Sequence, residues 1–118
     1  MCTVRQTNRV FSKLTDADLN KTPSWDKSAE NPPVSARAAV KLATGVKDSL
    51  VKDSPHSKWR FRCLHLEYKD LPAVGRKWYW RIRFEEWIDR ELPTPIAPMV
   101  EVIVLMNGTT RTTIRPEP

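Results

Sequence analysis

The 118-residue chain has little glycine, cysteine and histidine: three glycines, two cysteines and two histidines. Three scattered glycines exclude a glycine-rich phosphate-binding loop, because such a loop needs several glycines within a few residues. Two cysteines, Cys2 and Cys63, are too few for a disulfide framework or a structural zinc site. The two histidines, His56 and His65, have no partners at ligand spacing and no third group to orient a nucleophile. We therefore predict no catalytic residue, no metal site and no cofactor.

The chain also lacks a long apolar run and a run of like charges. No stretch of about 18 apolar residues exists, so we expect no membrane-spanning helix. The net charge of +6 is spread along the sequence instead of forming one basic stripe or tail, which makes nucleic acid an unlikely partner. The first residues, MCTVRQTNRVF, lack the apolar core of a signal peptide. The compartment stays open: cytosolic, or periplasmic or otherwise extracytoplasmic if a leader is removed before Met1.

The two cysteines have different expected states. Cys63 lies in a stretch that predicts a strand, and we expect it to be a buried thiol. A bridge between Cys2 and Cys63 is a minor alternative. Lipid modification of Cys2 would require a leader peptide that is cleaved in front of it.

What is present, 10 prolines and 5 tryptophans among 118 residues, indicates stiff connections and a core built from large rings. The length suits one hydrophobic core. Residues 1–33 are mixed and polar and predict a partly ordered N-terminal extension, and residues 34–118 predict a single α+β domain. Trp25 stands alone in the extension, and we expect its ring to pin the extension onto the domain.

One segment has a helical pattern, SARAAVKLATGVKDSLVKD, and predicts a helix over Ser35–Asp53. Its apolar residues recur at spacings of three and four, with small alanines on the inner stripe and charges on the other faces. Ser35 is the expected N-cap, and Pro55 helps to end the helix.

From Ser57 onward the hydrophobic period changes to two, which is typical of strands. In KWRFRCLHLEYK, Trp59, Phe61 and Cys63 share one face, and the apolar parity then shifts to Leu64. Such a shift predicts a β-bulge near Cys63–Leu64.

Three further segments complete the predicted sheet. RKWYWRIRFEE alternates cleanly, with Trp78, Trp80, Ile82 and Phe84 on one face, so its rings and charges are explained by a half-buried strand. The proline-rich residues 91–98 form a connection to MVEVIVLM, a buried strand. Asn107-Gly108 predicts a type I′ hairpin turn into the edge strand TTRTTIR. The expected fold is one helix packed on a four-stranded antiparallel meander.

This array resembles PepSY-like domains, whose cystatin-like fold wraps a curved sheet around one helix. The resemblance covers about Ser35 to Ile114 and is carried by WYWRIRFE followed by an apolar strand that ends at NG. It implies a small bacterial module, commonly exported, at times associated with restraining peptidases, and without catalytic residues. The wedge loop that cystatins insert into cysteine proteases is absent, which puts inhibition by that route in doubt.

The sheet face opposite the helix is the candidate binding surface. Its predicted members are an arginine and aromatic set: Arg60, Arg62, Tyr79, Arg81, Arg83 and Trp87. Cross-strand charge pairs, for example Arg60 with Glu85, would make the same face an ordinary solvated surface. The acidic cluster Glu85, Glu86, Asp89 and Glu91 is interleaved with arginines and is interpreted as surface ion pairs.

We predict a non-catalytic protein-binding or regulatory module, acting as a monomer or weak homodimer on an unknown protein partner. The alternative is a polyanion or nucleic-acid binding protein that uses the same basic face. A third hypothesis is an enzyme whose site forms only between chains, with His56 or His65 at the interface.

Overall fold

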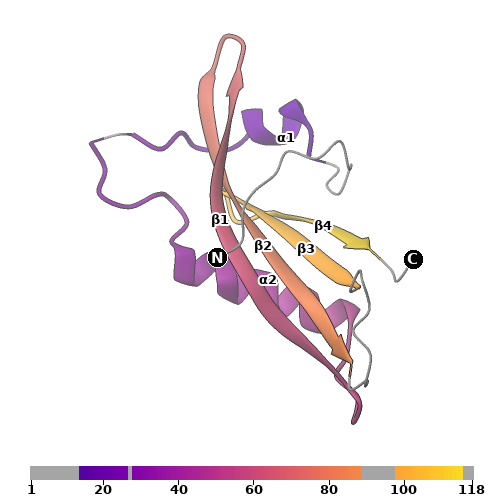
Figure 1. Cartoon of the computed structure of the whole chain (residues 1–118). Helices are drawn as coiled ribbons and strands as arrows, with labels where there is room; N and C mark the ends of the chain where they lie inside the picture. The colour runs from indigo at the N-terminus through magenta and orange to yellow at the C-terminus, as the bar shows by residue number, and fades with distance from the viewer. Residues whose placement is uncertain (1–13, 27, 89–97, 116–118) are drawn as a thin grey trace.

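The computed structural model describes residues 14–26, 28–88 and 98–115. Its elements follow in the order α1 (Asp16–Asn20), α2 (Ala36–Leu50), β1 (Ser57–Leu71), β2 (Gly75–Ile88), β3 (Met99–Leu105) and β4 (Thr110–Arg115). The strands form one antiparallel sheet in the order β1-β2-β3-β4 (Figure 1). The predicted α+β fold, one main helix on a four-stranded meander, is confirmed.

Helix α2 begins where the sequence predicts and ends earlier. The Ser35 hydroxyl accepts a hydrogen bond from the Ala38 amide at 3.1 Å, as expected of an N-cap. The predicted end at Asp53 is wrong, because Val51 already adopts an extended backbone with φ −136° and ψ 155°. Asp53 instead lies beside the sheet, where its carboxylate accepts the Trp59 amide at 2.8 Å.

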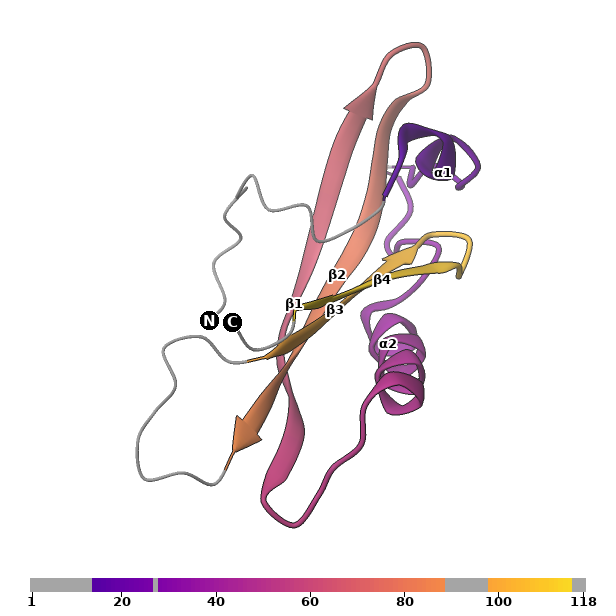
Figure 2. The same ribbon diagram turned by 90° about the vertical axis from the view of Figure 1, so that its right-hand side faces the viewer.

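The main core lies between α2 and one face of the sheet, which we call the helix face (Figure 2). Ala39 and Ala43 are fully buried, so their small side chains let the helix approach the strands closely. They pack with a row of strand residues and with one residue of the turn that follows β3: Trp80, Ile82, Phe84, Val100, Val102, Val104 and Met106. The predicted inward face of the second strand is therefore confirmed, with Trp78 half-buried at its margin.

Strand β1 contains the predicted bulge. The register shifts between Phe61 and Cys63, which makes Arg62 the extra residue. Beyond it, Leu64 and Leu66 lie opposite Ile82 and Trp80 and so share the helix face. Cys63 is buried, as predicted, but its predicted face is wrong, because the bulge moves it to the opposite side of the sheet.

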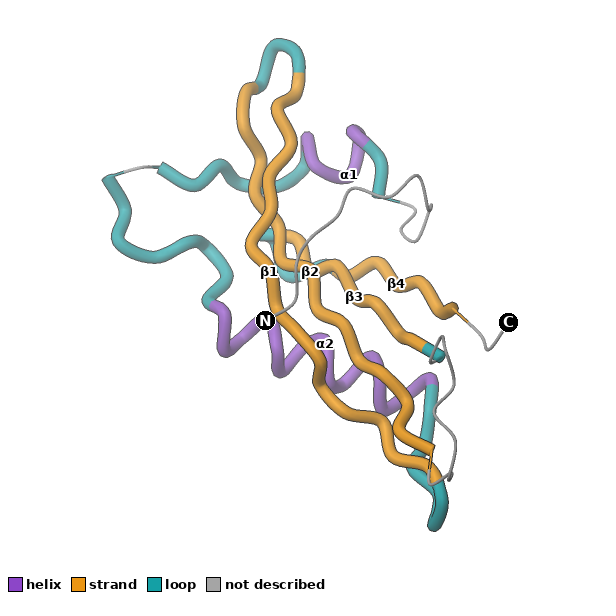
Figure 3. The backbone as a smooth tube through the Cα atoms, in the orientation of Figure 1, coloured by secondary structure: helices purple, strands orange, loops and turns teal. Residues whose placement is uncertain are grey.

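Strands β1 and β2 form a hairpin much longer than the rest of the sheet. They have 15 and 14 residues, whereas β3 has 7 and β4 has 6. Strand β3 pairs with β2 only from Tyr79 to Glu85. The β1–β2 hairpin therefore extends beyond β3 at both ends (Figure 3).

The second face of the sheet, which we call the outer face, is partly covered by α1. Leu19 of this short helix is fully buried among Leu71, Tyr79, Ile103 and Leu105. These strand residues alternate with those that face α2, so the two helices lie on opposite sides of the sheet. Figure 2 shows α1 and α2 on either side of the β3–β4 hairpin. The sequence pattern does not predict this second layer.

The segment after α1 is tied to both faces. Buried Lys77 on the outer face donates to the Thr22 carbonyl at 2.7 Å and to the Ser24 hydroxyl at 3.0 Å. The Trp25 ring packs edge-on against Trp78 on the helix face, with the ring centroids 5.4 Å apart. The predicted anchoring role of Trp25 is confirmed, and residues 22–25 pass from one face of β2 to the other.

The β3–β4 hairpin forms at the predicted place with a different turn. Gly108 has a φ of +85°, but Asn107 lacks the positive φ that a type I′ turn requires at both positions. The Leu105 amide donates to the Thr109 carbonyl at 2.9 Å, which leaves a three-residue loop. The predicted type I′ turn is therefore wrong. The loop has three residues, and such a loop needs only one left-handed residue, here Gly108.

Asp18 fastens α1 to β4 and should make the stability of the protein depend on pH. Arg111 donates to its two carboxylate oxygens at 2.7 and 3.2 Å. These hydrogen bonds, followed by that from the Thr15 amide, lower the pKa of Asp18 from 3.8 to about 2. Because the pKa is lower in the folded state, this contribution is complete above pH 3.8 and is lost as the pH falls towards 2.

Asp18→Asn should therefore unfold at a lower temperature than the unsubstituted chain at pH 7, and the two melting temperatures should converge as the pH falls from 4 to 2. Thermal unfolding followed by circular dichroism across this range measures the difference. A gap that stays constant with pH would contradict the role given to Asp18.

Candidate functional site

The middle of the outer face holds a network of four charged side chains, Glu67, Arg81, Arg83 and Glu101, which we call the charge network. Strand alternation brings them together, since Arg83 lies opposite Glu101 and Arg81 precedes Arg83 by two residues on the same face of β2. Arg81 donates to both carboxylate oxygens of Glu67, at 2.9 and 3.1 Å, and also bonds to Glu101. Arg83 reaches the second oxygen of Glu101 at 3.3 Å.

The charge network is balanced and largely withdrawn from water. The Glu101 side chain is 1 % exposed, and its two arginine partners supply the opposite charge that a buried carboxylate needs. Burial acts to lower the pKa of Arg81, but the carboxylates of Glu101 and Glu67 outweigh it and raise that pKa. Arg81 and Arg83 are thus committed to internal ion pairs, and the structure does not offer them as the open platform that the sequence predicted.

Tyr79 is also removed from the predicted binding face. The residue is 8 % exposed and packs with Leu19, Leu71 and Leu105. Burial of the hydroxyl, with the Glu67 carboxylate nearby, raises the pKa of Tyr79. The prediction that Tyr79 belongs to an exposed binding surface is wrong, because alternation along β2 gives its face correctly but does not reveal that α1 covers that face.

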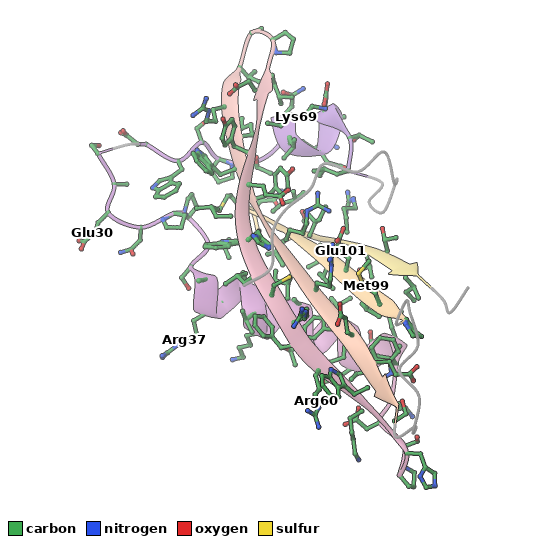
Figure 4. The ribbon with its side chains drawn as sticks, viewed as in Figure 1. Glu30, Arg37, Arg60, Lys69, Met99 and Glu101 are labelled. Atoms are coloured by element: carbon green, nitrogen blue, oxygen red, sulfur yellow. The ribbon has the colours of Figure 1, made fainter. Side chains whose placement is uncertain are left out.

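Arg60, Arg62 and Trp87 do form an exposed cluster, at the end of the β1–β2 hairpin far from the turn after Leu71. Trp87 is 58 % exposed, and the Arg60 guanidinium lies over its ring, 4.8 Å from the ring centroid. Lys58, directly opposite Trp87 on β1, is exposed as well. Figure 4 shows Arg60 pointing away from the ribbon, whereas Glu101 lies over the middle of the sheet. We call Lys58, Arg60, Arg62 and Trp87 the basic–aromatic surface.

The predicted ion pair between Arg60 and Glu85 does not form. The two residues are cross-strand neighbours, as the prediction requires. However, Arg60 stacks on Trp87, and Glu85 pairs with Arg62 at 3.7 Å. The bulge explains the exchange, because it inserts Arg62 into β1 and brings a second guanidinium within reach of the same carboxylate.

A second aromatic cluster, not predicted as a unit, lies near the hairpin turn on the helix face. The Arg76 guanidinium stacks 3.8 Å from the Tyr68 ring centroid, and Tyr68 and Trp78 have ring centroids 5.0 Å apart. Arg76 also donates to Asp70 at 2.9 Å, and this hydrogen bond lowers the pKa of Asp70. Because Trp25 completes the cluster, its evident role is to hold the N-terminal segment.

The two histidines lie apart, and one of them shares a face of β1 with Cys63. His56 lies in the exposed turn before β1. His65 and Cys63 both lie on the outer face beyond the bulge. The Nε2 atom of His65 is buried without a hydrogen-bond partner. In the described ranges, no three His, Cys, Asp or Glu side chains gather in a way that could hold a metal ion.

Several predicted features lie outside the described residues. These are Cys2, with its possible bridge or lipid, Asp89 and Glu91 of the acidic cluster, and most of the proline-rich connection.

Comparison of the chain with models of known protein families, with curated proteins and with solved structures finds no significant match. Neither helix in the described part of the chain is long and apolar enough to cross a membrane.

Proposed function

We propose that the chain is a non-catalytic protein-binding or regulatory module that recognises an acidic surface of its partner through the basic–aromatic surface. The observation that carries this proposal is the exposed Trp87 ring with the Arg60 guanidinium stacked on it. Removing an exposed indole ring from water is favourable, so a partner that covers Trp87 gains binding free energy. Tryptophan and arginine are also among the side chains most enriched at the energetic centre of protein interfaces.

The charges around Trp87 indicate the character of the partner. Arg60 stacks on the ring and Lys58 lies opposite it, whereas Arg62, further along β1, is exposed and paired with Glu85. A cationic rim attracts an acidic surface and speeds its association. The proposed partner is therefore an acidic protein surface with an apolar element that covers the indole.

The architecture supports a PepSY-like assignment as part of this proposal. A single main helix packed on a four-stranded antiparallel meander is the arrangement that the resemblance implies. Restraint of a peptidase is one regulatory role of that class, and it requires no catalytic residue. Helix α1 on the outer face is an addition to this pattern.

The balanced charge network disfavours the polyanion alternative. Nucleic acid binding needs several cations along the phosphate backbone. On the predicted face, Arg81 and Arg83 are paired with Glu67 and Glu101, and Arg62 is paired with Glu85. The exposed cations of the basic–aromatic surface therefore form a short group at one end of the face and not a row along it.

The proposal is tested by capture of partners from cells that contain the protein, followed by measurement with the purified partner. Trp87→Ala should weaken binding about 30-fold, the effect of losing an interface hot spot. Arg60→Glu should weaken binding more at low salt than at high salt, because salt screens the repulsion between the new carboxylate and the acidic partner. Arg37→Glu, which changes an exposed arginine of α2, is the matched control. Equal binding by Trp87→Ala and by the control would overturn the proposal.

A further inference from the structure

Strand β1 has one edge that no other described strand covers. The sheet order places β1 at the margin, and all of its 15 residues except the bulged Arg62 pair with β2 on one side. Figure 3 shows β1 running along the full length of the sheet margin. An edge of this length carries a row of backbone amides and carbonyls that another strand can bind. We call this side of β1 the open edge.

The ladder determines which residues point into the open edge. The Glu86 amide donates to the Pro98 carbonyl at 3.1 Å, so the backbone of Glu86 is directed away from β1. Antiparallel pairing repeats every two residues, so Ile82 and Trp80 are directed away from β1 in the same way. Their partners on β1, Leu64 and Leu66, therefore direct their amides and carbonyls away from β2 and into the open edge.

The chain closes the first part of this edge by itself. The Asp53 carboxylate accepts the Trp59 amide at 2.8 Å, and the backbones of Ser54 and Ser57 bond to each other. These contacts occupy the start of β1 and end at Trp59. The stretch that follows, from Arg60 to Tyr68, contains Leu64 and Leu66 and is the part on which a further strand would have backbone groups to bind.

Side chains along this stretch differ between the two faces. On the helix face, an apolar row is available to a neighbour: Phe61, which is 51 % exposed, Leu64, Leu66 and Tyr68. On the outer face, Arg60 and the bulged Arg62 are exposed, Arg60 over the Trp87 ring and Arg62 beside Glu85. An added strand with apolar residues on one face and acidic residues on the other would match both rows. A second copy of the chain would instead bring its own cations to this edge.

We propose that the partner supplies an extended segment of alternating apolar and acidic residues, which adds to the sheet as a fifth strand along the open edge of β1. This inference rests on the proposed function and specifies how the partner binds. Backbone hydrogen bonds from Leu64 and Leu66 provide affinity, and the two rows of side chains provide specificity. Apolar residues of the segment pack on Phe61 and Leu66, while its carboxylates face Arg60 and Arg62.

The test uses a fluorescent ten-residue peptide of alternating glutamate and valine. Two matched peptides carry N-methyl groups, one on all valine amides and the other on all glutamate amides. Alternate amides of a strand point to opposite sides, so methylation of only one series removes the hydrogen bonds to β1. If the peptide adds antiparallel to β1, the residues that exchange hydrogen bonds with Leu64 and Leu66 have their side chains on the helix face, as these leucines do. The valines are expected on that face, so methylation of the valine amides should remove the hydrogen bonds. Fluorescence anisotropy should show at least about tenfold weaker binding for that peptide, as expected for several lost hydrogen bonds, and little change for the other.

Protein variants separate this inference from the proposed function. Arg60→Glu with Arg62→Glu should weaken binding of the unmethylated peptide about tenfold or more, and Arg37→Glu should not. If both methylated peptides bind as tightly as the parent and the charge variant weakens all three, strand addition is overturned and recognition by the basic–aromatic surface stands. If the parent peptide fails to bind while Trp87→Ala still weakens the captured partner, the alternating segment is overturned alone. Loss of both effects overturns both proposals.

Discussion

Replacement of Glu101 by glutamine should lower the free energy of unfolding by about 3 to 5 kcal/mol, the usual cost of removing one member of a buried ion pair. Glu101 is 1 % exposed and is the shared partner of Arg81 and Arg83. The substitution keeps the shape of the side chain and removes its charge. Arg83 would then be left half-buried beside Arg81 without a compensating carboxylate. Urea unfolding followed by tryptophan fluorescence measures the change.

Glu85→Gln is the matched control for Glu101→Gln, because Glu85 lies on the same face of the sheet. Its single ion pair, with exposed Arg62 at 3.7 Å, predicts a loss of at most about 1 kcal/mol. If the two variants lose equal stability, the charge network is not the buried element described above.

Leu19→Ala should lower the free energy of unfolding by about 2 to 5 kcal/mol, the range for truncating a fully buried leucine. Leu19 is the residue through which α1 fills the space over Tyr79, Ile103 and Leu105. The cavity would lie directly above these side chains, and their neighbours are strands that relax little. Chemical unfolding of the purified chain tests the magnitude.

Leu50→Ala, at the exposed end of α2, provides the comparison for Leu19→Ala. Leu50 is half-exposed, so its truncation should cost well under the value for Leu19. Limited proteolysis adds a second measurement, since loss of α1 docking should expose the segment around Leu19 before the sheet unfolds. A Leu19→Ala variant as stable as Leu50→Ala would show that α1 does not belong to the core.

Much of the fold follows from patterns that act over short distances. The spacing of Ala39 and Ala43 predicts the buried stripe of α2, and alternation predicts the inward face of Trp80, Ile82 and Phe84. The change of parity around Cys63 predicts a bulge, which the structure places one residue earlier, at Arg62. In these cases one segment of sequence contains the whole signal, because periodicity alone decides which side chains can be buried.

The covering of the outer face could not be predicted in this way. Helix α1 has five residues, too few for a periodic pattern, and Leu19 finds its partners on strands far along the chain. A fixed alternation assigns Tyr79 and Arg81 to the face opposite α2, which is correct, but it cannot show that another element lies over them.

One sequence signal for the charge network was present in β3. Glu101 is the single charged residue of an otherwise apolar strand, and a carboxylate in such a strand needs a cation beside it. Arg81 and Arg83, both on one face of the neighbouring strand, are the available cations. Trp87 was identified from the opposite kind of signal, a ring that breaks the alternation of its strand, and the structure places it in solvent.

The bond between Asp18 and Arg111 joins residues 93 positions apart. During synthesis from the N-terminus, Leu19 and Asp18 leave the ribosome long before Ile103, Leu105 and Arg111 are made. Helix α1 therefore cannot complete its docking on the sheet until the β3–β4 hairpin has been synthesised. The earliest residues of the fold to be translated are among the last to reach their native positions, and the growing polypeptide completes its outer layer only at the end.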